Sequence, residues 1–349
     1  MRVAGRLHIT AAAVALPTGC ESLSDAVASG AITTEQAAAS DTEKLWVTEA
    51  GQSAESLALA AAADALTEAG LSGSDIGLLT HAWMIDTPDD WKTASRLARL
   101  LGAKHAIASS TRQMSNGGAV ATQFALAQML AEPRIDNAMV VTADALGPGE
   151  NRRWQISDSG AALSDSATAL ILGRSGGSLS VQSIVSRGCP DQEAFFDGYN
   201  PLAIGQEVSE ASKNAFSGPF AFRLRGRVRT AIQQACADAD LAEEDPRLTV
   251  TVLPRINSTV TAALTEGLLP TEEIVHLSAQ TGHLFAGDLI ANLNYLRTRR
   301  PLAAGEYGLV INIGLGFTVT ALVVCGTEEK QHGRDSTDTD RVIGLTAPQ

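Results

Sequence analysis

The chain has 349 residues, 45% of them hydrophobic and 19% charged, so it is long enough to bury a large core as two domains or one double unit. Its formal net charge of -13 argues against a nucleic-acid partner, because phosphate binding needs a basic surface. No run approaches the roughly 18 apolar residues of a membrane span. We therefore expect no membrane partner. Because the cysteines lack the spacing of a metal site or a disulfide framework, we also expect a cytoplasmic protein.

The first half of the chain predicts alternating strands and helices. Residues 1–16 alternate like a strand, and Arg6 and His8 interrupt the apolar run that a signal peptide would need. Apolar periodicity then predicts a helix over 53–69, a buried strand over 76–83, a helix over 91–101, a short strand over 106–108, a helix over 119–130, and buried strands over 138–142 and 167–172.

The second half repeats this pattern after a glycine joint at 176–177. A new unit begins over 179–185, and the residues after it predict helices over 220–239, 258–267 and 288–298, and strands over 248–253, 308–313 and 317–325. We therefore expect an internally duplicated α/β fold with its active site between the halves. The predicted halves are residues 1–175, which carry a nucleophile, and 176–326, which carry a base; a polar, disordered tail covers 327–349.

Ser115 is the candidate nucleophile, in the run QMSNGG over 113–118. A serine at a glycine-rich helix start has unpaired backbone N–H groups and the positive end of the helix dipole beside it, which suits an acyl-carrying residue. The alternative is an ordinary helix N-cap. A serine hydroxyl also needs a neighbouring general base, because it titrates far above neutral pH.

His283 is the candidate base, since it occupies a place in the second half that corresponds to Ser115 in the first. Asp288 would orient its imidazole and stabilise the cation. Residues five apart on a regular helix lie about 140° apart around the axis, so this pair can meet only if 283–287 is irregular. The alternatives are a structural histidine and a helix-capping carboxylate.

Further candidates bind the reacting groups. The turn Gly314-Leu315-Gly316 places the Leu315 amide where, with the Ser115 amide, it would form an oxyanion hole; the alternative is a plain β-turn. The candidate substrate-binding residues are Trp83, Asn116, Asn257, Gly314 and Gly316.

A run of arginines marks a candidate contact for coenzyme A or an acidic carrier protein. It comprises Arg223, Arg225 and Arg227, followed by Arg229. Because alternate residues do not share a helix face, only part of the run can meet one ligand, and a solvated helix face is the alternative.

Several of these segments together resemble ketoacyl-acyl carrier protein synthase III, over residues 1–326. The resemblance rests on the helix over 53–69, the SNGG helix start, Asp144, Gly160, DSATAL over 165–170 and GLGFT over 314–318. It implies a thiolase-like, five-layered α-β-α-β-α fold with two pseudo-equivalent halves, a homodimer, and a nucleophile at Ser115, where ketosynthases carry cysteine.

The departures from that family concern its condensation residues. Where the ketosynthases carry a His-Gln-Ala-Asn motif this chain has PRIN over 254–257, and where they carry an active-site asparagine it has His283. Decarboxylating a malonyl thioester needs two neutral hydrogen-bond donors on the enolate oxygen, so these changes remove the machinery of condensation.

The altered residues resemble the acyltransferase branch of the family, found in actinobacterial antibiotic pathways. The matching segments are Asp90-Trp91 with Ala94-Ser95, Arg153-Trp154, and residues 282–288. This resemblance implies transfer of an acyl group, typically aromatic and of the salicylate or orsellinate type, from a coenzyme A or acyl carrier protein thioester. The acceptor would be a sugar or cyclitol hydroxyl, an amine or a carrier protein, with no metal or other cofactor. The alternatives are a starter-unit ketosynthase III and a catalytically silent partner subunit.

Overall fold

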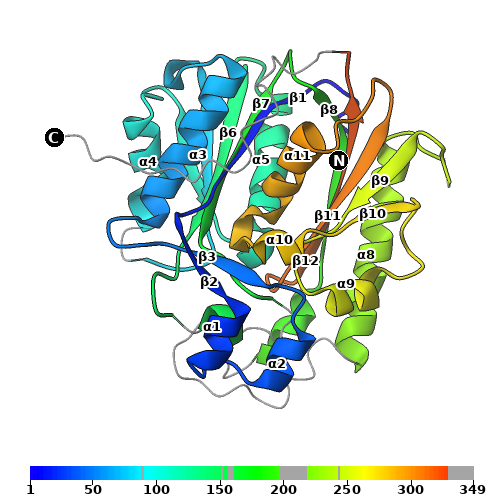
Figure 1. Cartoon of the computed structure of the whole chain (residues 1–349). Coiled ribbons are helices and arrows are strands. Elements are labelled where there is room, and N and C mark those ends of the chain that lie inside the picture. The colour runs from blue at the N-terminus through cyan, green and yellow to red at the C-terminus, as the bar shows by residue number, and fades with distance from the viewer. Residues whose placement is uncertain (88–89, 151, 156–160, 197–217, 243, 329–349) are drawn as a thin grey trace.

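The structure is a computed structural model that describes residues 1–87, 90–150, 152–155, 161–196, 218–242 and 244–328. Gly160 and most of the expected polar tail, residues 329–349, lie outside this range. The described chain is a mixed α/β protein with a ten-stranded sheet and a separate two-stranded sheet (Figure 1).

The first half contributes five strands of the large sheet. Its main elements are β1 (His8–Ala15), α3 (Ala54–Ala69), β4 (Leu78–Ala82), α4 (Asp90–Leu100), β5 (Ile107–Thr111), the 3-10 turn η2 (Met114–Asn116), α5 (Gly117–Ala131), β6 (Asn137–Asp144) and β7 (Ser166–Gly173). Shorter elements are β2 (Gly19–Ser22), α1 (Leu23–Ala28), α2 (Thr34–Ala39), β3 (Lys44–Val47), η1 (Gly73–Asp75) and α6 (Arg152–Gln155).

The second half contributes the other five strands. Its elements are β8 (Leu179–Gly188), η4 (Pro190–Phe196), α8 (Gly218–Asp238), β9 (Leu248–Val252), α9 (Ser258–Thr265), β10 (Glu273–Val275), α10 (Ser278–Thr281), η5 (Phe285–Gly287), α11 (Asp288–Thr298), β11 (Tyr307–Gly314) and β12 (Thr318–Gly326).

The strand pairing of the first half is repeated in the second. β1 pairs antiparallel with β7 and β7 with β6, whereas β6, β4 and β5 run parallel. In the same way β8 pairs antiparallel with β12 and β12 with β11, whereas β11, β9 and β10 run parallel. The two sets of strands join at β1 and β8, where His8 pairs with Ser180 and Ile9 with Leu179. The fold therefore has two pseudo-equivalent halves; the boundary between residues 175 and 176, in the loop from β7 to β8, stays a prediction.

The helices form three layers that alternate with the two halves of the sheet (Figure 1). On one outer face α3 packs on β1, β6 and β7, and α4 packs on β4 and β5. On the other outer face α8 packs on β8 and β12. Helices α5 and α11 contact each other and lie between the two halves, so their N-termini meet inside the molecule.

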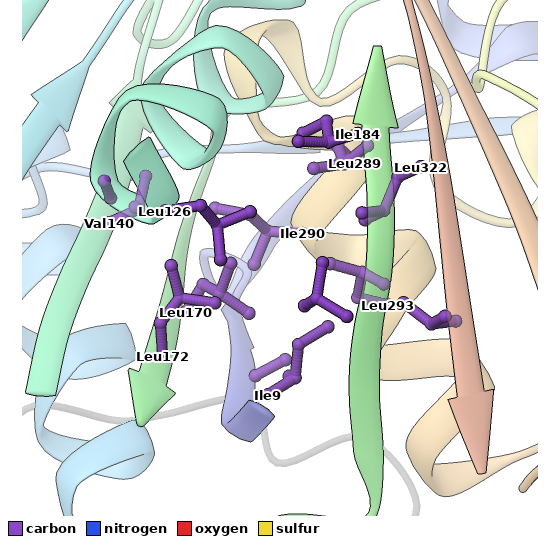
Figure 2. Close-up of a cluster of buried hydrophobic side chains, with 14 of the residues drawn as sticks. Ile9, Leu126, Val140, Leu170, Leu172, Ile184, Leu289, Ile290, Leu293 and Leu322 are labelled. Atoms are coloured by element: carbon purple, nitrogen blue, oxygen red, sulfur yellow. The ribbon is translucent and has the colours of Figure 1, made fainter. Parts of the chain in front are cut away.

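The core around α5 and α11 is an apolar cluster that fixes these two helices relative to each other. In Figure 2 side chains from α5, α11 and the strands on either side converge between the two helices. The labelled members, all fully buried, are Ile9, Leu126, Val140, Leu170, Leu172, Ile184, Leu289, Ile290, Leu293 and Leu322. Because such a core is closely packed and hardly compressible, it fixes the position of the two helices, and so of their N-termini, relative to each other.

Most of the long elements agree with the periodicity, and the differences have local causes. α3 begins after a Ser53 capping box and ends at Gly70 in the left-handed conformation. β5 is longer than the expected strand over 106–108, because it lies at the sheet edge and much of it is exposed and polar. Apolar periodicity did not predict α1 and α2, which are six residues each and begin with capping boxes at Ser22 and Thr33.

Candidate active site

Ser115 lies in η2, a short turn between the end of β5 and the start of α5. Met114 immediately before it has φ of 50°, a left-handed conformation that is uncommon for a residue with a side chain and is found where a tight turn presents a functional group. The N-cap of α5 is Asn116, so Ser115 is not the cap of that helix. Its carbonyl oxygen accepts a hydrogen bond from Nδ2 of Asn312, at 2.9 Å, which ties the turn to β11.

The Gly314-Leu315-Gly316 turn packs directly against the Ser115 segment. A Cβ atom on Gly314 would lie 2.5 Å from the Asn116 nitrogen, and one on Gly316 would lie 2.7 Å from the Gln113 carbonyl oxygen. Both distances are far shorter than a van der Waals contact. These glycines therefore allow the second half to approach the Ser115 turn, and their contact with substrate stays a prediction. The amide of Leu315 lies in the turn between them.

His283 connects Ser115 to Asp288 through two short hydrogen bonds. Its Nε2 atom lies 2.7 Å from Oγ of Ser115, and its Nδ1 atom lies 2.7 Å from Oδ2 of Asp288. All three side chains are at least nine-tenths buried. With Nδ1 protonated and facing the carboxylate, Nε2 is free to accept the serine proton, which is the arrangement that activates a serine for nucleophilic attack.

The contact between His283 and Asp288 depends on an irregular backbone. His283 forms an isolated parallel bridge with Leu163, Phe285 has φ of 54°, and residues 285–287 form the 3-10 turn η5 before α11 begins at Asp288. The N-cap of α11 is Gly287, so Asp288 is its first helical residue. The irregularity that the sequence analysis required is therefore present.

The main chain of His283 is held on both sides. Its N–H donates to the Ala162 carbonyl oxygen at 2.7 Å, and its own carbonyl oxygen accepts from the Ser164 N–H at 3.0 Å. The adjacent Asp165 forms a fully buried ion pair with Arg153, at 3.2 Å, and accepts from the Thr48 hydroxyl at 2.7 Å. Thr48 directly after β3, Arg153 in α6 and Asp165 directly before β7 thus hold the segment that positions His283.

Asp288 accepts three hydrogen bonds, which keep it ionised. Besides His283, the N–H groups of Leu284 and Arg255 donate to it, each at 2.8 Å. Burial tends to raise the pKa of this carboxyl, but the His283 and Arg255 charges and these hydrogen bonds outweigh burial, so its pKa is lowered from the ordinary value. An ionised Asp288 at the N-terminus of α11 also interacts favourably with the helix dipole.

Arg255 is a buried cation beside the site that the sequence analysis did not assign a role. Its Nε donates to Oδ1 of Asn292 at 3.0 Å and its Nη1 to Oγ1 of Thr281 at 2.8 Å. Burial lowers its pKa to about 10, against the Asp288 charge, so it remains protonated near neutral pH. The only sign in the sequence that Arg255 lies at the site was that residues 254–257 differ from the ketosynthase motif.

Asp144, at the end of β6, is a second buried carboxyl close to the site. It accepts from the N–H groups of Met84 and Ile85, at 2.7 and 2.8 Å, and from that of Ala286 at 3.5 Å. Burial raises its pKa to about 7, although these hydrogen bonds and the His283 charge act in the opposite direction. In the sequence Asp144 stood out only as part of the family resemblance. The signal that could have identified it as a site residue is an acidic residue at the end of an apolar strand.

An apolar wall faces the nucleophile. Sδ of Met84 lies 3.5 Å from Oγ of Ser115. Met84 belongs to a buried cluster with Ala161, Leu163, Ile256 and Phe285, and partly buried side chains of Ile85, Met114, Leu146 and Val260 pack against this cluster.

Three of the predicted substrate-binding side chains bind the protein itself. Asn116 is fully buried; its Nδ2 donates to Thr318 and Thr320, and its Oδ1 accepts from Asn312. Asn257 is the N-cap of α9 and donates to the Ala39 carbonyl oxygen. The Trp83 ring stacks on His81, with 5.3 Å between centroids, and its Nε1 donates to Asp86.

Three arginines of α8 also have partners within the chain. Arg223 pairs with Asp191 at 2.9 Å, Arg225 donates to the Ala263 and Glu266 carbonyl oxygens at the end of α9, and Nε of Arg227 lies 3.3 Å from Sγ of Cys189. For Arg225 the structure therefore shows a helix-capping contact. Binding of coenzyme A by this run stays a prediction.

Within the described ranges, no three or more His, Cys, Asp and Glu side chains gather in a way that could hold a metal ion. Among the helices described, none combines the length and the apolar character needed to cross a membrane.

Known proteins resemble this chain in structure rather than in sequence. No protein-family model matches it, and no curated protein matches it in sequence. ChlB3, described as an acyltransferase, is 25% identical, with a TM-score of 0.82 over 94% of this chain and 100% of its own. A cysteine-to-serine variant of OleA from Xanthomonas campestris, with bound lauric acid and lauroyl-CoA, is 16% identical, with a TM-score of 0.76 over 92% of this chain and 99% of its own.

A cerulenin-bound OleA from the same organism gives a TM-score of 0.74 at 16% identity, over 91% of this chain and 98% of its own. At that identity OleA supports the fold alone, whereas ChlB3 also supports the type of reaction. The chain therefore has the thiolase-like, layered α/β fold, and its structural neighbours support an enzyme of acyl transfer or related thiolase-type chemistry.

Proposed function

We propose that this protein is an acyltransferase that carries the acyl group on Ser115 between a thioester donor and a hydroxyl or amine acceptor. The observation that carries the proposal is the hydrogen-bonded chain Ser115, His283 and Asp288, with both joining distances at 2.7 Å. This chain supplies a nucleophile, a base and a carboxylate that favours the base in its cationic form.

In the first step, Nε2 of His283 takes the Ser115 proton while Oγ attacks the thioester carbonyl carbon. The N–H groups of Ser115 and Leu315 would stabilise the oxyanion, because the Leu315 turn packs against the Ser115 turn. The carbon–sulfur bond then breaks, His283 returns its proton to the departing thiolate, and an acyl ester remains on Ser115.

In the second step, the acceptor enters and His283 removes the proton of its hydroxyl or amine. The acceptor attacks the ester carbon, and Ser115 leaves with the proton from His283. No electron transfer occurs in either step, so the proposed reaction does not call for a redox cofactor, and His283 and the two N–H groups take the roles that a metal would otherwise fill. A base at position 283 suits this deprotonation of the acceptor, which a condensation reaction does not need.

The donor in this proposal is a coenzyme A or acyl carrier protein thioester, and the acyl group is aromatic, of the salicylate or orsellinate type. The acceptor is a sugar, a cyclitol or a carrier protein in a natural-product pathway, and the protein acts as a cytoplasmic homodimer. The likeness to ChlB3 and the apolar wall beside Ser115 support the acyl-transfer part of this proposal.

Condensation is the less favoured chemistry at this site. Pro254 has no side-chain donor to place on an enolate oxygen, and the Arg255 guanidinium is bound to Asn292 and Thr281. Neither residue provides the pair of neutral donors that stabilise a developing enolate.

The proposal is tested by incubating the protein with benzoyl-coenzyme A and measuring the intact mass. We expect one benzoyl adduct, which Ser115→Ala abolishes and the matched exposed-serine control Ser110→Ala retains. Adding an acceptor alcohol should release the adduct as an ester. Absence of an adduct with any acyl thioester would favour a silent partner subunit, and carbon dioxide release from a malonyl thioester would favour a ketosynthase.

A further inference from the structure

The side chain of Met84 lies beside the Ser115 oxygen that would carry the acyl group. Its Sδ atom is 3.5 Å from Oγ of Ser115, and His283 occupies another side of the same oxygen at 2.7 Å. An acyl carbon joined to Oγ, together with its substituents, comes within contact distance of an atom at that separation. Acylation therefore places the acyl group against the Met84 side chain or requires that side chain to turn aside.

The backbone of Met84 is fixed from two directions. The N–H groups of Met84 and Ile85 donate to the buried Asp144, at 2.7 and 2.8 Å, and the Met84 carbonyl oxygen accepts from Nη2 of Arg112 at 3.2 Å. Because the main chain is held in this way, Met84 can adjust to an acyl group only by rotating its side chain, which is flexible about three bonds.

The neighbours of Met84 limit both the size and the polarity of the acyl group. Met84 itself is 3% exposed, and Leu163, Ile256 and Phe285 behind it are buried. The partly buried members of the cluster are Ile85, Met114, Leu146 and Val260. All of these side chains are apolar, which disfavours a charged acyl group.

We propose that Met84 is the specificity-determining residue of the acyl site: it contacts the acyl group on Ser115, disfavours a charged group and restricts the bulk of the group. This inference rests on the proposed acyl-Ser115 intermediate. A thioether packs favourably at the edge or face of an aromatic ring, so Met84 also favours an aromatic acyl group over an aliphatic one of the same size. A shorter side chain at position 84 leaves more space beside Ser115, so that an acyl group with a second fused ring fits.

The experiment compares benzoyl and 2-naphthoyl thioesters of N-acetylcysteamine. Adduct formation at Ser115 is followed by intact-protein mass spectrometry in wild type, Met84→Ala and the matched control Met129→Ala. Met129 is a fully buried methionine on α5 in the separate cluster around Leu126, so its truncation creates a similar cavity away from Met84. Met84→Val is used in the same assay if Met84→Ala does not fold.

We expect wild type to react mainly with the benzoyl thioester. Met84→Ala should raise the ratio of naphthoyl to benzoyl acylation rates by about tenfold or more, as expected when a pocket gains the volume of a few methylene groups. Met129→Ala should leave the ratio unchanged, whatever it does to stability.

Two results would overturn the inference. The first leaves the proposed function standing, and the second overturns it as well. If wild type is acylated on Ser115 but the ratio in Met84→Ala equals that of wild type or of Met129→Ala, Met84 does not set the specificity and the proposed function stands. If neither thioester nor benzoyl-coenzyme A acylates wild type, the proposed function fails together with the inference.

Discussion

His283 and Asp288 are five residues apart in sequence, yet Nδ1 of one lies 2.7 Å from Oδ2 of the other. A continuous helix could not bring these side chains together, because they would point to different sides of it. The 3-10 turn η5 and the left-handed Phe285 break the helix before α11 and rotate His283 toward the carboxylate. The orientation of the base thus depends on a backbone irregularity that buried neighbours maintain.

Replacing Asp288 with asparagine should keep the shape of the site but remove the charge that orients His283. The amide could hold the wrong imidazole tautomer, so we expect the rate of Ser115 acylation to fall by about 10⁴-fold. Stopped-flow release of thiol from benzoyl-coenzyme A measures this rate. Acylation within tenfold of wild type would show that Asp288 serves only to stabilise the start of α11.

Replacing Gly314 with alanine should push the second half away from the Ser115 turn. The new Cβ atom would lie 2.5 Å from the Asn116 nitrogen, so we expect a loss of about 1–3 kcal/mol in unfolding free energy and slower acylation. Urea denaturation and thiol release measure the two effects.

The matched control for this change is Gly226→Ala in α8. A Cβ atom there meets nothing within 4 Å, so the control should gain up to about 1 kcal/mol from helix propensity. Equal effects of the two substitutions would contradict the role assigned to the Gly314 contact.

Asp144 should make stability decrease as pH rises toward neutrality. Its pKa is about 7 in the folded protein, against an ordinary value of 3.8, so the folded state binds the proton more tightly than the unfolded state. The contribution is present in full below about pH 4 and is lost as pH rises through about 7, by up to about 4 kcal/mol.

The measurement is urea unfolding of wild type and Asp144→Asn at pH 4.5, 6.0 and 7.5. Asparagine keeps an acceptor for the Met84 and Ile85 N–H groups but does not ionise. Relative to the variant, wild type should lose stability across this range. A difference between the two that is independent of pH would contradict the raised pKa.

Arg255 should keep Asp288 ionised at acidic pH. Its charge is one of the interactions that lower the pKa of Asp288, so Arg255→Gln should raise that pKa and shift the acid limb of the acylation rate to higher pH. Arg255→Lys retains the charge and should leave the limb in place. If the acid limb of the acylation rate is unchanged in Arg255→Gln and only the overall rate is reduced, Arg255 acts only through packing.

Much of the layered architecture was predictable because it follows from local patterns. Apolar runs such as Asn137–Asp144 and Ser166–Gly173 indicate strands buried on both faces, and the Ser53 cap and Gly70 mark the ends of α3. The region of α1 and α2 was not predictable in this way, because its helices are too short to show a period and depend on capping hydrogen bonds.

By itself the sequence determined the repeat of strands and helices, and it pointed to Ser115 and His283 through their residue types and their corresponding places in the two halves. The tertiary structure decided which atoms meet: Asp288 reaches His283, Gly314 admits the Ser115 turn, Asp144 holds Met84, and Met84 lies against the nucleophile. Except for the first, these contacts join segments far apart in the chain, and the first depends on an irregular turn. Periodicity and capping are local properties, so they cannot determine contacts that arise only when the two halves pack around α5 and α11.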